Sequence, residues 1–110
     1  MSDKMMLYFI HMLECIDKIE DFTKDGEALF LQSTLIQDAV YRNLEIIGAA
    51  ASKVNAETRE AFPDIPWRKM VGLRNILIHQ YEGVEPAVTW LVILNELPKL
   101  KIALRKIVPK

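Results

Sequence analysis

The chain has 110 residues, of which 51% are hydrophobic and 26% charged, and its formal net charge at pH 7 is −1. This balance excludes a disordered chain and predicts one folded domain over residues 1–110. The near-neutral charge argues against nonspecific binding of nucleic acid through a generally basic surface, so an RNA-binding role needs a local basic site.

The single cysteine and the N-terminal segment both indicate a cytoplasmic protein. Cys15 cannot form an internal disulfide, and its apolar neighbours Leu13, Ile16 and Ile19 predict a buried thiol in a reducing compartment. The first six residues lack the apolar core of a signal peptide, and no window of about 20 residues is free of charges. We therefore expect neither export nor a membrane span.

The first predicted helix begins near Ser2 or Asp3, either of which can cap it. Its apolar residues recur at intervals of three and four, and it should end between Phe22 and Gly26. His11 falls between the core positions of this helix. We interpret His11 as a solvated surface residue and leave it out of the candidate site.

A second, longer helix is predicted from about residue 27 to residue 55, because this stretch contains no proline and keeps one apolar stripe. Asp38, Arg42 and Glu45 lie at intervals of four and three along it. This spacing indicates local ion pairs on an exposed face. The alternative is that Arg42 and Glu45 support a nearby functional site.

Prolines divide the rest of the chain. Residues 58–62 can form one short helical turn, after which Pro66 suits the start of a helix that is apolar almost all round and so buried on several sides. Pro86 is placed to start the last helix, which Pro98 should kink without splitting. The prediction is an all-α fold, an antiparallel bundle of four main helices plus one short helix.

The stretch from Arg74 to Tyr81 reads Arg-Asn-Ile-Leu-Ile-His-Gln-Tyr and concentrates groups that bind phosphate or move protons. The guanidinium of Arg74 matches phosphate oxygens, and the imidazole of His79 can donate or accept a proton near neutral pH. Five residues of helix turn by about 500°, which leaves Arg74 and His79 about 140° apart. A joint site therefore needs a bent helix end or a second subunit.

A second subunit would also supply a second histidine. RNA cleavage without a metal needs a general base for the 2′-hydroxyl and a general acid for the leaving oxygen, and a two-fold dimer would bring both copies of His79 together. The alternative without catalysis has His79 and Arg74 bonded to the backbone or to Glu45, with Tyr81 packed beneath. No second histidine or cysteine stands at ligand spacing, so we expect no metal and no cofactor.

Arg74, His79 and Tyr81 match the Rx4HxY pattern of HEPN-domain proteins, and specifically of the HepT-like toxins. Residues 41–48, Tyr-Arg-Asn-Leu-Glu-Ile-Ile-Gly, resemble that family's second-helix signature, and residues 65–75 resemble its approach to the motif. The resemblance covers most of the chain. It identifies the domain as HEPN-like.

Two positions depart from the family pattern: Ala49, where an acidic residue is common, and Gln80, where aspartate is common. The resemblance implies a dimeric, metal-independent ribonuclease toxin whose two chains line one cleft. In it, Arg74 holds the scissile phosphate, His79 acts in acid or base catalysis, and Asn75 supports the site by hydrogen bonding.

The resemblance also implies a partner, a minimal nucleotidyltransferase antitoxin of the MntA type, in a toxin–antitoxin pair of type II or a type VII-like kind. That partner would transfer AMP from ATP to Tyr81. A nucleotide two residues from His79 would occupy the place that the RNA phosphate needs. The alternative function is a noncatalytic module that pairs with a nucleotidyltransferase, which the near-neutral net charge favours slightly.

Overall fold

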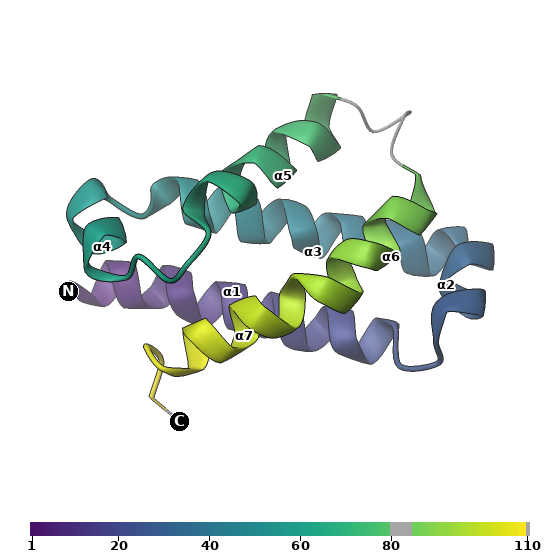
Figure 1. Ribbon diagram of the computed structural model, residues 1–110, viewed down its shortest axis with the longest axis horizontal. Coiled ribbons are helices and arrows are strands. Elements are labelled where there is room, and N and C mark those ends of the chain that lie inside the picture. Colours follow the sequence, from purple (N-terminus) through teal and green to yellow (C-terminus); the bar gives the residue numbers. More distant parts are fainter. Residues whose placement is uncertain (80–84, 110) are drawn as a thin grey trace.

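The computed structural model describes the backbone of residues 1–79 and 85–109, and the side chains of residues 1–73 and 85–109. Within these ranges every regular element is a helix, which confirms the all-α prediction (Figure 1). The helices are α1 (Asp3–Phe22), α2 (Glu27–Gln32), α3 (Thr34–Lys53), α4 (Ala56–Ala61), α5 (Trp67–His79), α6 (Pro86–Asn95) and α7 (Leu97–Arg105). None of the helices so described is long and apolar enough to cross a membrane.

The long helices form a bundle (Figure 1). Helices α1 and α3 lie antiparallel along its length, and α5 packs on α3. Helices α6 and α7 follow one another across the bundle, where α6 contacts α2 and α7 contacts α1. The four main helices of the prediction are therefore α1, α3, α5 and the α6–α7 pair, with two short helices beside them where one was predicted.

Helix α1 agrees with the prediction in its bounds and in its buried face. The Ser2 hydroxyl oxygen accepts a hydrogen bond from the N–H of Met5 at 3.2 Å, as a capping residue does. His11 is exposed, as expected. Cys15 is buried at 5% exposure, and burial raises the pKa of its thiol. The side chains with the least exposure in the core are Phe9, Met12, Ile16, Ile19, Phe30, Val40, Leu44, Ile47 and Leu104.

The single helix predicted over residues 27–55 is wrong, because the chain breaks at Ser33. The Ser33 hydroxyl oxygen accepts a hydrogen bond from the N–H of Ile36 at 3.1 Å and so caps α3. The side-chain amide of Gln37 donates to the carbonyl oxygen of Phe30 at 2.9 Å, at the end of α2. These side-chain hydrogen bonds replace backbone hydrogen bonds that a continuous helix would make. The stretch contains no proline from which the break could be predicted.

The last helix is also two helices, α6 and α7, which meet at Glu96. Pro98 has no N–H, so a continuous helix would leave the carbonyl oxygen of Leu94 without its donor. The N–H of Leu100 still donates to the carbonyl oxygen of Glu96 at 3.1 Å. The prediction of one bent helix is therefore wrong about continuity but right about phase, since the buried residues Leu97, Leu100 and Leu104 continue the stripe of α6.

Candidate active site

Helix α5 carries the motif, and its first residue, Trp67, is held by neighbours from two other elements. The indole Nε1 of Trp67 donates a hydrogen bond to the carbonyl oxygen of Phe62 at 3.1 Å. Its ring meets the ring of Phe9 from α1 edge-on, with centroids 5.8 Å apart. Pro66 stands directly before the helix, as predicted, and its carbonyl oxygen accepts from the N–H of Met70 at 3.1 Å. The start of α5 is thus fixed against the bundle.

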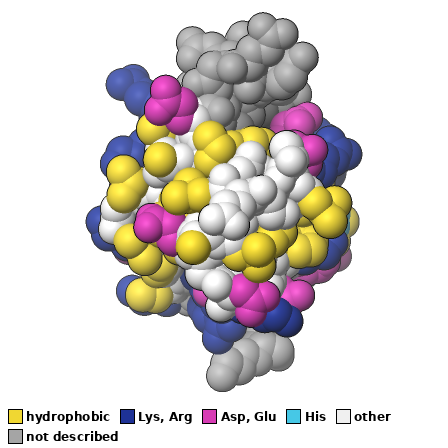
Figure 2. Space-filling view, turned by 90° about the vertical axis from the view of Figure 1, so that its right-hand side faces the viewer, with side chains coloured by type: hydrophobic (Ala, Val, Ile, Leu, Met, Phe, Trp, Pro, Cys, Tyr) yellow, Lys and Arg dark blue, Asp and Glu magenta, His cyan; other side chains and the backbone are white. Residues whose placement is uncertain are grey.

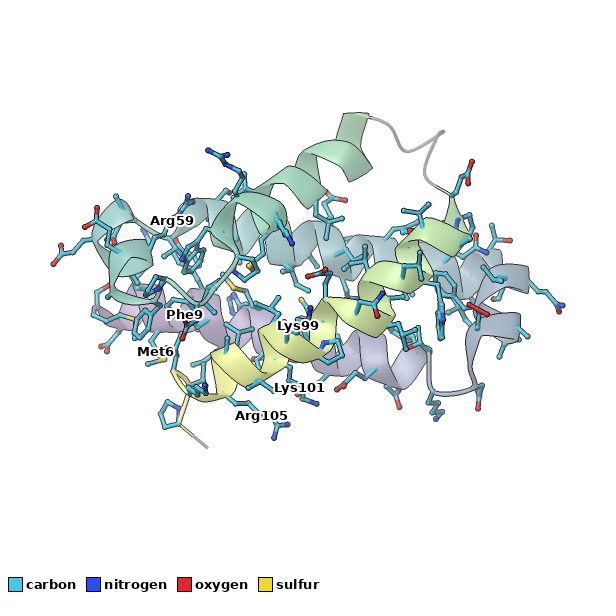
Figure 3. All side chains as sticks on the ribbon, viewed as in Figure 1. Met6, Phe9, Arg59, Lys99, Lys101 and Arg105 are labelled. Carbon is cyan, nitrogen blue, oxygen red and sulfur yellow. The ribbon has the colours of Figure 1, made fainter. Side chains whose placement is uncertain are left out.

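Arg59 of α4 completes this anchor (Figure 3). Its guanidinium lies 5.6 Å from the centroid of the Trp67 ring, within the range of a cation–π contact. The same side chain donates hydrogen bonds to the carbonyl oxygen of Val54 at 3.0 Å and to that of Ala51 at 2.9 Å. Arg59 therefore ties the end of α3 to the start of α5, which sets the direction in which the motif helix leaves.

The rotation of α5 about its own axis is set by the face that it packs on the bundle. Met70 is buried and Leu73 half-buried, and both line an apolar groove with Leu44 and Ile47 of α3. Arg68 is exposed. The described half of α5 therefore packs one broad face on the bundle. The prediction that the helix is buried on several sides also rests on Ile76, Leu77 and Ile78, whose side chains lie outside the described residues.

The motif residues Arg74, Asn75 and His79 occupy the last turns of α5, and their side chains lie outside the described residues. Tyr81 lies outside them altogether. Because α5 is helical through His79, the positions of Arg74 and His79 stay about 140° apart around its axis. The catalytic and modification roles of these residues remain predictions.

A different set of positions does share one face of α5. Arg68, Gly72, Asn75 and His79 are separated by intervals of four, three and four residues, which is the spacing of one helical stripe. Met70 lies on the opposite side of the helix, against the core. The sequence analysis missed Arg68 and Gly72, although the spacing that joins them to Asn75 and His79 is readable in the sequence.

Arg42 and Glu45 form the ion pair that their spacing indicated, with Nη1 of Arg42 3.6 Å from Oε1 of Glu45. The two side chains are 68% and 39% exposed, so the pair contributes at most about 1 kcal/mol. They line a shallow surface groove with Tyr8, His11 and Lys53. Their supporting role beside the motif remains a prediction.

An apolar groove of about 240 Å³ lies beside α5, between that helix and the α6–α7 pair. Lys69 and Glu96 are its only charged lining residues among the described side chains. Its walls come from α3, α5, α6 and α7 and from the residues directly before α5 and between α6 and α7: Leu44, Ile47, Pro66, Lys69, Met70, Leu73, Val92, Glu96, Leu97 and Leu100. Sequence reasoning missed this groove because it depends on how α5 diverges from α6, which no local pattern predicts.

Hydrophobic side chains are also exposed at the end of the bundle where α2 and α6 meet. Figure 2 shows that end with hydrophobic side chains gathered across it and charged side chains mostly around its rim. On α6, Val88, Leu91 and Leu94 recur every three residues and are each more than half exposed, at 58%, 54% and 58%. Helix α6 thus has one face in the bundle and a second apolar face without a partner among the described residues.

Comparison with known proteins gives one consistent result. Residues 12–107 match the family described as "Ribonuclease HepT-like". The chain is 44% identical over 99 residues to "Putative RNase MJ1380" of Methanocaldococcus jannaschii, a match that covers 89% of both chains. It is 39% identical over 95 residues to "Probable ribonuclease HepT" of Thermococcus cleftensis, covering 86% of both.

One relative is matched over only about half of its length. "Gamma-glutamylcyclotransferase and putative RNase MJ0434" of Methanocaldococcus jannaschii is 43% identical over 108 residues, which are 97% of this chain and 49% of that protein. The chain therefore spans about half the length of this relative. No solved structure matches the chain.

Proposed function

Because the chain belongs to the HepT-like ribonuclease family, we propose that it is a metal-independent endoribonuclease and the toxin of a toxin–antitoxin pair, of type II or a type VII-like kind. The observation that carries this proposal is the family match over residues 12–107, which includes the whole stretch from Arg74 to Tyr81. Helix α5 supports it, because the bundle fixes the start of the helix that holds the motif.

In the proposed reaction, the 2′-oxygen of a ribose attacks the neighbouring phosphorus while one His79 imidazole accepts the 2′-hydroxyl proton. A second imidazole gives a proton to the departing 5′-oxygen as its bond to phosphorus breaks. The products are a 2′,3′-cyclic phosphate and a 5′-hydroxyl. Arg74 neutralises charge on the phosphoryl oxygens, and Asn75 supports the site by hydrogen bonding.

The second imidazole comes from a second copy of the chain. The sequence has two histidines, and the other one, His11, is on the surface of α1. A two-fold dimer places the same residues of both chains around one cleft, so each chain contributes an Arg74 and a His79. The exposed apolar face of α6, with Val88, Leu91 and Leu94, supports such a contact because a homodimer interface buries apolar surface.

In this proposal the antitoxin blocks the ribonuclease by modifying Tyr81. A partner nucleotidyltransferase of the MntA type would direct the phenol oxygen of Tyr81 to the α-phosphorus of ATP, which forms the AMP ester and releases pyrophosphate. The added phosphodiester carries a negative charge two residues from His79, and it repels the RNA phosphate while the nucleoside fills the cleft. Tyr81 is therefore a modification acceptor, since a phenol with a pKa near 10 is a poor proton carrier at neutral pH.

The second candidate function is a noncatalytic module that binds and regulates a nucleotidyltransferase. The observation in its favour is the net charge of −1, since such a module need not bind a long polyanion. It shares the modification of Tyr81 with the first proposal but predicts no cleavage of RNA by the unmodified protein.

The test is to incubate end-labelled RNA with protein that intact mass shows to lack AMP, in excess chelator. The proposal predicts cleavage that leaves 2′,3′-cyclic phosphate ends, and loss of cleavage after the nucleotidyltransferase and ATP add AMP. Cleavage that appears only when a divalent metal is restored would contradict metal independence. Absence of cleavage over several RNAs would favour the noncatalytic module.

A further inference from the structure

Gly72 has no steric explanation among the described residues. Glycine in the middle of a helix destabilises it relative to alanine, so an interior helical glycine usually meets a steric need. Gly26, at φ 98°, is the one described residue whose backbone takes a positive φ, so Gly72 needs no special conformation. A Cβ added at Gly72 would meet no described atom within 4 Å beyond its own helix backbone. With respect to the described residues, the missing side chain therefore leaves open space on this side of α5.

The position of Gly72 indicates which part of the molecule a partner in this space would contact. Gly72 lies in the stripe of Arg68, Asn75 and His79, on the side of α5 away from Met70 and the core. From residue 68 to residue 79 this stripe is about 16 Å long at the rise of an α-helix. It leads from an exposed cation to the two proposed site residues, so an extended partner that follows the stripe past Gly72 also passes the position of His79.

The charge of the stripe favours a polyanion as that partner. Arg68 is exposed, and the ion pairs among the described residues are made by Lys24, Arg42 and Lys101, not by Arg68. A guanidinium is the side chain best matched to phosphate oxygens.

We propose that a single strand of the RNA substrate lies along this stripe, with Arg68 binding a phosphate some nucleotides away from the scissile one and Gly72 letting the sugar–phosphate backbone approach the helix. This inference rests on the proposed function, whose substrate class it shares, and adds two residues to the binding site. Arg68 is a substrate-binding residue, and Gly72 is a positioning residue that acts by the space it leaves.

The experiment measures binding separately from cleavage. The probe is a fluorescent single-stranded 2′-O-methyl RNA, which keeps the phosphates but has no 2′-hydroxyl to react. Gly72→Ala is expected to raise Tm by a few degrees, because alanine favours helix, and to weaken binding about tenfold, because its methyl group fills the space. If Gly72 had only a structural role, Gly72→Ala would not both raise Tm and weaken binding of the RNA probe.

Arg68→Ala is expected to weaken binding and to reduce the salt dependence of log Kd by about 0.7, the value for one phosphate contact on a single strand. The matched control is Arg105→Ala, since Arg105 is an exposed arginine on α7, on the opposite side of the bundle from α5 (Figure 3). This control should bind as the wild type does.

Wild-type affinity and salt dependence in both Gly72→Ala and Arg68→Ala would overturn the inference. So would a Gly72→Ala variant that loses its dimer in light scattering while its dimeric fraction binds normally, since Gly72 would then serve a contact between copies. If the wild type cleaves RNA but the variants bind normally, this inference fails and the proposed function stands. If Gly72→Ala and Arg68→Ala weaken binding as predicted but the wild type cuts no RNA, the proposed function fails, and the stripe stands as an RNA-binding surface.

Discussion

The guanidinium of Arg59 lies over the ring of Trp67 at 5.6 Å, and Trp67 is the first residue of the helix that carries the motif. The same guanidinium bonds the carbonyl oxygens of Ala51 and Val54, at the end of the helix on which α5 packs. One side chain thus joins the two helices whose relative direction places His79. Loss of this contact should therefore lower the stability of the fold and disturb the position of the proposed active site.

Arg59→Ala should destabilise the fold by about 2 kcal/mol, because it removes two hydrogen bonds from a charged group and a cation–π contact. Urea unfolding followed by circular dichroism measures the change. Arg105→Ala, at an exposed position on α7, should stay within about 0.5 kcal/mol of the wild type. If the two variants unfold at the same urea concentration, Arg59 does not hold α5 in place.

Ser33→Ala should destabilise the fold by about 1 kcal/mol, because the N–H of Ile36 loses its cap. Ser52 offers a matched control, since its hydroxyl is exposed and donates to a carbonyl oxygen within the same helix, that of Ala49. Thermal unfolding should show a lower Tm for Ser33→Ala than for Ser52→Ala. A higher Tm for Ser33→Ala would indicate that α2 and α3 prefer to join as one helix.

Leu91→Glu should convert the proposed dimer to a monomer, because a charge in the middle of the exposed apolar face of α6 cannot be buried without a partner. Ile102→Glu is the control, since Ile102 is 61% exposed on α7, outside this face. Light scattering measures the mass of each variant. The composite site predicts that Leu91→Glu also loses RNA cleavage; a monomeric variant with full activity would show that one chain suffices.

Tyr41→Phe should stabilise the protein slightly or leave it unchanged. The Tyr41 hydroxyl is buried and has no hydrogen-bond partner among the described residues, so removing it also removes the cost of its desolvation. Urea unfolding measures the difference in free energy of unfolding between Tyr41→Phe and the wild type. A decrease of more than about 1 kcal/mol in the free energy of unfolding would indicate that the hydroxyl has a hydrogen-bond partner in residues 74–84, where side chains are not described. Tyr41 would then be connected to the motif.

The sequence predicted well those features that local chemistry determines. The bounds of α1 follow from a serine cap and an apolar stripe, and the start of α5 follows from Pro66. The burial of Cys15 and the exposure of His11 follow from their places around one helix. The family follows from the Rx4HxY pattern of Arg74, His79 and Tyr81 together with residues 41–48 and 65–75, and the match over residues 12–107 confirms it.

The sequence failed where its apolar periodicity did not show which side chains form hydrogen bonds. The break at Ser33 depends on two side-chain hydrogen bonds, the cap that Ser33 gives to Ile36 and the bond from Gln37 to the carbonyl oxygen of Phe30, while the apolar stripe continues across it. The open side of α5 at Gly72 could not be predicted from an apolar composition, because it depends on which face α3 occupies.

The most direct test of the proposed active site uses the two histidines of the chain as a matched pair. Both His79→Ala and His11→Ala remove one imidazole, one at the end of α5 and one on the surface of α1. In excess chelator, the wild type and His11→Ala should cleave labelled RNA at similar rates, while His79→Ala should be slower by about 100-fold or more. Equal cleavage by all three proteins would contradict a ribonuclease site at this motif.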